Sequence, residues 1–155
     1  MTVGEKSIRV HEFGAGPALL MLHGGGAGAN GLSNYGKNID TLATRFRVIV
    51  ADMPGYGAST KGLDQADVFG DLARSMIGLL DALGVEQAHV IGNSLGGACA
   101  LRMALDAPER VERLVLIRHK LILVRADTHV VWRGDGLPAD VSALAQQLTG
   151  KGSPA

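Results

Sequence analysis

The hydrophobic positions of this chain follow two periods in turn, and together they predict alternating strands and helices. Continuous or nearly continuous apolar runs at residues 18–22, 46–51, 88–91 and 113–117 are typical of strands covered on both faces. Residues 8–12 alternate apolar with polar and indicate a half-exposed edge strand. Helical periods lie between the strands, at residues 34–43, 67–83 and 97–107. The period at 67–83 places its apolar residues on one stripe, and Gly84 is expected to end that helix in a left-handed conformation. Because such strands pair in parallel through right-handed crossovers, residues 8–117 predict an open, mostly parallel α/β sheet with helices on both faces.

Length, charge and cysteine content narrow the class of protein. The chain has 155 residues, of which 46% are hydrophobic, enough for the core of one domain. Lys and Arg total 15, as do Asp and Glu, so no net charge favours nucleic acid or an anionic membrane as a partner. No apolar run is long enough to span a bilayer, and we expect a cytoplasmic protein. Cys99 is the one cysteine, and we expect a buried, inert thiol.

Candidate chemistry is concentrated in Gly92-Asn93-Ser94-Leu95-Gly96, between the strand at 88–91 and the helix at 97–107. A serine between two glycines on a sharp strand-to-helix turn is typical of the nucleophile elbow of serine hydrolases. The glycines are needed because the serine backbone is strained and side chains two residues away on either side would collide. The alternative is an ordinary glycine-rich turn in which Ser94 caps the helix.

The glycine loop His23-Gly24-Gly25-Gly26 also follows a buried strand and has two interpretations. In a hydrolase its backbone N–H groups would stabilise the negative oxygen of a tetrahedral intermediate, together with the N–H of Leu95. In a dinucleotide-binding protein the spacing Gly24-x-Gly26-x-x-Ala29 would cradle a pyrophosphate, with Asp52 on the ribose. Residues 27–31 are poor helix formers, which counts against the second interpretation, since the pyrophosphate needs a helix that starts there.

Three loops are expected to meet at one edge of the predicted sheet. The segments at residues 23–28, 52–57 and 93–95 all follow the carboxyl ends of predicted parallel strands. Ligands of open α/β sheets bind outside these ends. The sequence therefore places a site where the glycine loop meets the Ser94 turn.

Four motifs occur together in this order: His23-Gly24-Gly25-Gly26-Ala27-Gly28-Ala29, Ser33-Asn34-Tyr35, Asp52-Met53-Pro54-Gly55-Tyr56-Gly57-Ala58-Ser59 and Gly92-Asn93-Ser94-Leu95-Gly96-Gly97. On these motifs the chain resembles the α/β-hydrolase fold. More narrowly it resembles the meta-cleavage-product hydrolases, which hydrolyse carbon–carbon bonds in aromatic and steroid ring degradation. The resemblance covers about residues 8–117, with Ala27 where the family usually has proline.

The resemblance implies a role for each matching residue. Ser94 would be the nucleophile, and the N–H groups of Gly25 and Leu95 would form the oxyanion hole. Asn34 and Asn93, with Gly24 and Gly26 of the glycine loop, would bind the oxygen-rich end of a small-molecule 2-hydroxy-6-oxo-dienoate. From the residues alone, Asn34 could equally cap a helix and Asn93 could be a strain-tolerant turn residue. No metal and no organic cofactor is implied, and an esterase or a non-enzymatic binding protein on the same fold stays open.

A serine hydroxyl needs a base, and the base needs an orienting acid, which in this family follow the serine in the order acid, then histidine. Asp127 is the candidate acid, at the end of the apolar run 121–124, and His119 and His129 are the later histidines. None matches the expected position well. We therefore expect residues 1–117 to form the N-terminal part of the core and residues 118–155, with a candidate helix at 138–148, to be a divergent or truncated tail.

Two consequences of that division are expected. A chain that is the N-terminal portion of a longer hydrolase would be inactive or weakly active by itself. A sheet that ends early would expose a strand edge and an apolar face, which predicts marginal stability or self-association as a homo-oligomer.

Overall fold

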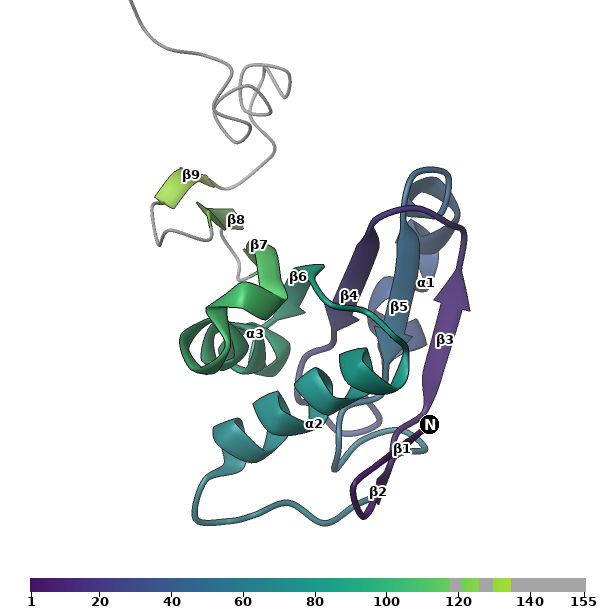
Figure 1. The fold of residues 1–155 in the computed structure, drawn as a ribbon, viewed down its shortest axis with the longest axis vertical. Coiled ribbons are helices and arrows are strands. Elements are labelled where there is room, and N and C mark those ends of the chain that lie inside the picture. Colours follow the sequence, from purple (N-terminus) through teal and green to yellow (C-terminus); the bar gives the residue numbers. More distant parts are fainter. Residues whose placement is uncertain (118–120, 126–129, 135–155) are drawn as a thin grey trace, which may run out of the picture.

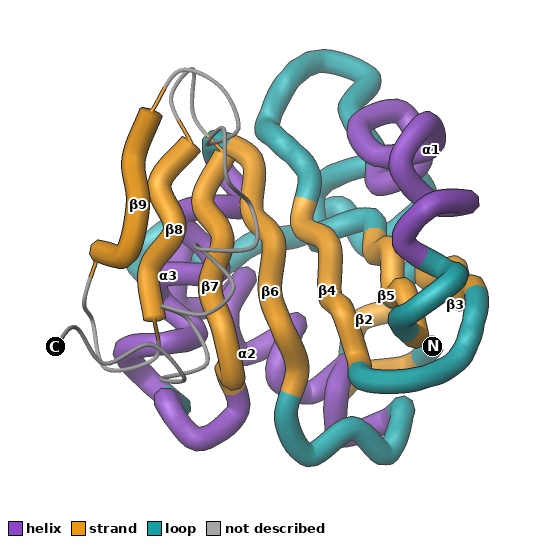
Figure 2. The backbone as a smooth tube through the Cα atoms, turned by 90° about the horizontal axis from the view of Figure 1, so that it is seen from above, coloured by secondary structure: helices purple, strands orange, loops and turns teal. Residues whose placement is uncertain are grey.

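The computed structural model describes residues 1–117, 121–125 and 130–134, which form a mixed sheet with helices on both faces (Figure 1). In this part of the chain the seven strands of the sheet run in the order β3-β5-β4-β6-β7-β8-β9 (Figure 2). Their bounds are β3 Val10–Phe13, β4 Ala18–Leu22, β5 Arg47–Ala51, β6 Ala88–Asn93, β7 Val111–Ile117, β8 Leu121–Arg125 and β9 Val130–Gly134. Because β5, β4, β6 and β7 are parallel, their carboxyl ends share one edge of the sheet.

The predicted α/β sheet is confirmed, and its edge strand differs in detail from the prediction. The strand predicted at residues 8–12 is β3 Val10–Phe13, and it pairs antiparallel with β5. Ile8 precedes it and is fully buried in the core. A short antiparallel hairpin of β1 Thr2–Val3 and β2 Lys6–Ser7 lies before it in the chain.

Helix α1, Gly31–Leu42, covers one face of the sheet and begins earlier than the predicted residue 34. Asn30 caps it: its side chain accepts the N–H of Ser33, and Ser33 Oγ accepts the N–H of Asn30. This reciprocal pair satisfies two backbone donors at the helix start. The interpretation of Asn34 as the cap is therefore wrong, and the Asn34 side chain is left for other contacts.

Helices α2, Val68–Ala82, and α3, Leu95–Asp106, cover the opposite face (Figure 2). The predicted apolar stripe of α2 is confirmed, since Leu72, Met76, Leu79 and Leu80 are fully buried. Gly84 follows α2 with a φ of +66°, the left-handed conformation expected at a helix end. Cys99 of α3 lies in the same core, and burial raises the pKa of its thiol to about 12, as expected for an inert residue.

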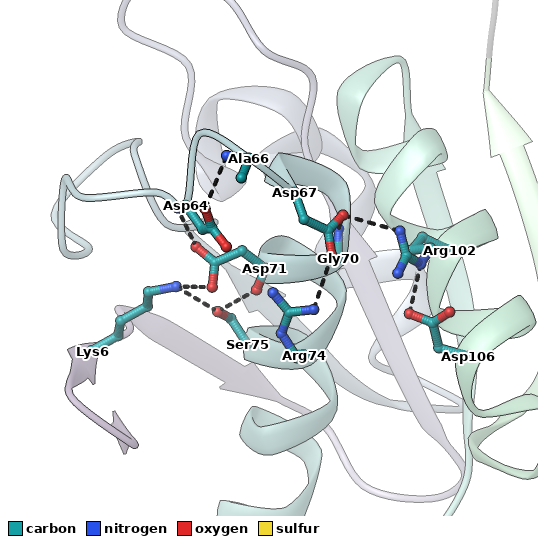
Figure 3. Close-up of polar contacts among 10 residues, drawn as sticks. All are labelled: Lys6, Asp64, Ala66, Asp67, Gly70, Asp71, Arg74, Ser75, Arg102 and Asp106. Atoms are coloured by element: carbon teal, nitrogen blue, oxygen red, sulfur yellow. Dashed lines mark hydrogen bonds and ion pairs between the residues drawn. The ribbon is translucent and has the colours of Figure 1, made fainter.

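Ion pairs join α2 to α3 and to the β1–β2 hairpin (Figure 3). Asp67 caps α2 by accepting the N–H of Gly70 at 3.0 Å, and it also accepts from Arg74 and from Arg102 of α3, each at 3.1 Å. The hydrogen bond from Arg74 is the main cause that lowers the pKa of Asp67. Lys6 pairs with Asp71 one turn further along α2. These contacts fix the start of α2 against α3, whose own start is the Ser94 turn.

Strand β8 runs in the opposite direction to that needed for an acid-bearing strand. It is antiparallel to β7, with Leu121 opposite Ile117 and Arg125 opposite Arg113. Its end therefore lies beside the amino-terminal half of β7, whereas a parallel strand would end at the carboxyl edge, where Ser94 lies. Residues 121–125 therefore do not form a strand that ends at the Ser94 edge of the sheet. Asp127, His119, His129 and residues 138–148 lie outside the described residues.

Within the described residues, no helix combines the length and the apolar character needed to cross a membrane.

Candidate active site

Ser94 forms the turn between β6 and α3 in a strained backbone conformation. Its φ is +50° and its ψ −108°, and in residues 1–117 it is the one non-glycine residue with a positive φ. Such a conformation costs on the order of 1–3 kcal/mol and persists only where the surroundings enforce it. The Ser94 side chain makes no cap hydrogen bond to α3. The alternative of a capping serine is therefore wrong, and the geometry is that of a nucleophile elbow.

The glycines on either side of Ser94 are enforced by close backbone contacts. A Cβ on Gly92 would collide with the carbonyl of Gly96 and would lie 2.6 Å from the Cα of Gly97. A Cβ on Gly96 would collide with the carbonyl oxygen of Leu22 and would lie 2.7 Å from that of His23. Because backbone atoms cannot rotate away as side chains do, both positions require glycine. The predicted steric reason for the two glycines is confirmed.

Gly25 of the glycine loop lies against Leu95, the residue after Ser94. A Cβ on Gly25 would come within 2.8 Å of Leu95 Cδ2 and within 2.8 Å of the Tyr56 hydroxyl. In the part of the chain that the structure describes, no hydrogen bond occupies the backbone N–H of Gly25 or of Leu95. The structure thus brings Gly25 into contact with the residue that follows Ser94, and the backbone N–H groups of Gly25 and Leu95 have no partner among the described residues.

Asn34 and Asn93 are joined in one amide network at the same edge. Asn34 Oδ1 accepts the N–H of Gly24 at 3.0 Å and Asn93 Nδ2 at 2.9 Å. Since a backbone N–H only donates, this network fixes which end of each amide is the oxygen. Asn34 Nδ2 and Asn93 Oδ1 have no hydrogen bond to any other described residue. The pair therefore offers one donor and one acceptor beside the glycine loop.

Tyr35 fixes α1 to the strand that leads into the glycine loop. Its hydroxyl donates to the carbonyl of Leu22 at 2.8 Å, and its ring is buried. Burial raises the pKa of the Tyr35 phenol, and a backbone hydrogen bond from Asn93 acts in the opposite direction. The neighbouring Asn34 is thereby held over the ends of β4 and β6.

His23 is a structural residue. Its Nε2 accepts the N–H of Met53 at 2.9 Å, so its Nδ1 carries the hydrogen and donates to the Gly24 carbonyl at 2.8 Å. Burial lowers the pKa of His23 and keeps the ring neutral. Because both ring nitrogens are occupied, His23 is not available as a base for Ser94.

The dinucleotide interpretation does not fit the geometry. Asp52 is buried, and its two carboxylate oxygens accept the N–H groups of Gly31 at 2.9 Å and Ala58 at 3.0 Å. Buried and bonded to two backbone donors, this carboxylate links two loops and is not presented to a ligand. The following helix begins at Gly31 behind its own cap, well past Gly24 and Gly26, so no helix N-terminus opens inside the glycine loop.

The base and the orienting acid are not found among the described residues. In this part of the chain Ser94 Oγ makes no hydrogen bond, and no cluster of three or more His, Cys, Asp or Glu could hold a metal. His89 on β6 lies 3.4 Å from the Glu112 carboxylate. Burial lowers the pKa of His89. The negative charge of Glu112 acts to raise this pKa, and the positive charge of Arg113 acts to lower it further. Asp127, His119 and His129 lie outside the described residues.

One contact of the site was missed by reasoning from the sequence. The turn after β5 was expected at the same edge as the other two loops, but no role was predicted for its Tyr56, whose ring lies 5.3 Å from that of His23 in the glycine loop. The available signal was an aromatic residue among the glycines of Asp52-Met53-Pro54-Gly55-Tyr56-Gly57.

Comparison with known proteins identifies the family. The model of the alpha/beta hydrolase fold family matches residues 17–146. The chain is 45% identical over 124 residues to a 2-hydroxy-6-oxononadienedioate/2-hydroxy-6-oxononatrienedioate hydrolase of Comamonas testosteroni. It is 43% identical over 123 residues to a 2-hydroxy-6-oxo-6-phenylhexa-2,4-dienoate hydrolase of Burkholderia cepacia. Each match covers 76% of this chain and 43% of the relative.

A solved structure agrees with these relatives. The meta-cleavage product hydrolase of Pseudomonas fluorescens superposes with a TM-score of 0.66 at 34% identity, over 69% of this chain and 39% of that one. The chain therefore belongs to the alpha/beta hydrolase fold family. Within that family it is similar to the meta-cleavage-product hydrolases, as the motifs predicted. It spans less than half the length of the curated relatives that it matches.

Proposed function

We propose that the chain provides the nucleophile, the oxyanion site and the dienoate-binding amides of a carbon–carbon bond hydrolase that acts on 2-hydroxy-6-oxo-dienoates. The observation that carries the proposal is the Asn34–Asn93 pair beside the Ser94 elbow. An elbow alone suits any serine hydrolase. Two linked amides that still offer a donor and an acceptor suit the carboxylate and 2-oxygen of a dienoate, which a simple ester lacks. The names of the relatives support the same substrate class.

The proposed reaction has two stages. The dienol first becomes a ketone: its 2-hydroxyl, which donates to Asn93 Oδ1, gives up its proton while a carbon of the dienol takes one up, and Asn34 Nδ2 donates to the carboxylate. Ser94 Oγ then starts the attack on the 6-oxo carbon, and the negative charge that develops on its oxygen is stabilised by the N–H groups of Gly25 and Leu95. The carbon–carbon bond breaks, water supplies the remaining oxygen and hydrogen, and a dienoate and a carboxylic acid leave. This route needs no metal and no organic cofactor.

Ser94 needs a general base in this mechanism. We propose that base and acid come from residues other than those the structure describes. His23 is occupied, and the described part of β8 ends away from Ser94.

Dienoate turnover tests the proposal. Hydrolysis removes the conjugated chromophore of a ring-cleavage dienoate, so absorbance should fall slowly with the chain present, in keeping with the weak activity expected of it, and stay constant with Ser94→Ala. A fluorophosphonate probe should label Ser94 in the wild type. Cleavage of short nitrophenyl esters without any dienoate turnover would favour an esterase. Absence of both turnover and labelling would favour a non-enzymatic binding protein.

The setting of the site is a separate proposal. We propose a cytoplasmic protein in which residues 1–117 carry the site and residues 118–155 are a divergent tail, and which self-associates through its sheet. Sedimentation should show a species larger than the monomer. A stable, fully folded monomer would contradict self-association.

A further inference from the structure

The turn after β5 presents one aromatic side chain to the glycine loop. Tyr56 is fixed at both backbone groups, since its N–H donates to the Met53 carbonyl at 3.0 Å and its own carbonyl accepts the N–H of Ser59 at 3.1 Å. Its ring meets the His23 ring edge to face, at 5.3 Å and 76°. The backbone of this turn therefore determines where the Tyr56 ring lies.

The same side chain closes one side of Gly25. The Tyr56 hydroxyl and Leu95 Cδ2 would each lie 2.8 Å from a Cβ at position 25, so Gly25 is packed between the two residues. Among the described residues the Tyr56 hydroxyl makes no hydrogen bond, so its contact with Gly25 is one of packing. On the other side of the ring, His23 is held by the Met53 N–H of the same turn.

We infer that Tyr56 is a positioning residue for the oxyanion site: packed against His23 and Gly25, it keeps the Gly25 N–H beside that of Leu95. This inference rests on the proposed function, in which those two N–H groups stabilise the developing oxyanion. A donor displaced by an ångström loses much of its effect in the transition state, because the site works by holding its dipoles in place before the reaction. Among the described residues, no hydrogen bond joins Tyr56 to Ser94 or to the Asn34–Asn93 pair.

Three variants separate packing from hydroxyl chemistry. Tyr56→Leu removes the ring, Tyr56→Phe keeps the ring and removes the hydroxyl, and Phe69→Leu makes a matched change at an exposed position of α2. We expect Tyr56→Leu to lower kcat by roughly 10- to 100-fold with KM nearly unchanged, because an oxyanion donor acts mainly in the transition state. The kcat of Tyr56→Phe should stay within about threefold of the wild-type value, and the kcat of Phe69→Leu should match the wild-type value.

The backbone amide of Gly25 gives a second readout that needs no turnover. In protein labelled with ¹⁵N-glycine, the Gly25 resonance should shift and broaden in Tyr56→Leu, and it should stay near wild type in Tyr56→Phe and Phe69→Leu. If no dienoate is turned over by the wild type, the proposed function fails, and the Gly25 resonance alone decides the inference.

Three results would overturn the inference. An unchanged Gly25 resonance in folded Tyr56→Leu would show that the ring does not hold the loop. A loss confined to KM would make Tyr56 a substrate-binding residue. An equal loss of kcat in Tyr56→Phe and Tyr56→Leu would mean that the hydroxyl itself acts on the substrate.

Discussion

Asn34 and Asn93 are 59 positions apart in the chain and share a hydrogen bond of 2.9 Å from Asn93 Nδ2 to Asn34 Oδ1. One asparagine lies in the first turns of α1, and the other is the last residue of β6, directly before Ser94. The bond couples the helix over one face of the sheet to the elbow at its edge. Because Asn34 Oδ1 also accepts the Gly24 N–H, the same amide orients the glycine loop.

Asn34→Asp should separate the proposed role of Asn34 in substrate binding from its hydrogen bonds to Gly24 and Asn93. The carboxylate keeps an oxygen for Gly24 and Asn93, but it replaces the free amide donor with a negative charge that faces an anionic dienoate. We expect KM to rise roughly 10- to 100-fold, the worth of a hydrogen bond to a charged group, while the melting temperature changes little. Asn34→Ala should raise KM and also lower the melting temperature. Steady-state kinetics and thermal unfolding check both, and an unchanged KM in Asn34→Asp would contradict substrate binding by Asn34.

Gly96→Ala should destabilise the elbow, because the new methyl would overlap the carbonyls of Leu22 and His23. Overpacking of this kind costs about 1–3 kcal/mol of the free energy of unfolding. Gly36→Ala in α1 is the matched control. It meets nothing within 4 Å, and alanine favours a helix over glycine by up to about 1 kcal/mol. Urea unfolding should therefore shift in opposite directions for the two variants, and equal shifts would count against the steric argument.

Asp52→Asn should loosen two loops at once. Each carboxylate oxygen of Asp52 accepts one backbone N–H, from Gly31 at the start of α1 and from Ala58 in the turn after β5. The amide of asparagine would turn a donor toward one of these donors and leave it buried without a partner, at a cost of about 1–3 kcal/mol. Asp40→Asn, at an exposed position of α1, should leave stability unchanged. Chemical denaturation of both variants decides, and equal midpoints would refute the bridging role.

Acidification should destabilise the fold through His23. Burial lowers the pKa of this ring in the folded chain below its ordinary value of 6.5. Above pH 6.5 the ring is neutral in both the folded and the unfolded chain, and its contribution to stability is fully present. As the pH falls below 6.5, His23 binds a proton in the unfolded chain but not in the folded chain. The free energy of unfolding therefore falls by up to about 1.4 kcal/mol per pH unit. His23→Gln should flatten this dependence between pH 7 and pH 5 in denaturant titrations. A variant with the same slope as the wild type would show that His23 takes no part.

Much of the architecture followed from residue patterns. The apolar run at residues 18–22 was predicted with its exact bounds, and the buried stripe of α2 and the left-handed Gly84 were also predicted. The start of α1 was misplaced because Asn30 and Asn34 are both good caps, and the choice depends on the reciprocal bond with Ser33. The direction of β8 could not be read from residues 121–125, because an apolar strand looks the same in either direction.

The sequence alone determined the strand–helix alternation, the glycine-flanked serine and the loops that follow strand ends, because these depend on periodicity and on steric limits of neighbouring residues. Only the tertiary structure decided how the loops meet. It placed Gly25 against Leu95 and Tyr56 and joined Asn34 to Asn93. It also engaged both ring nitrogens of His23 and both carboxylate oxygens of Asp52 in hydrogen bonds. Such contacts join residues far apart in the chain, and they are set by the packing of α1 and the parallel strands, which no local pattern of residues records.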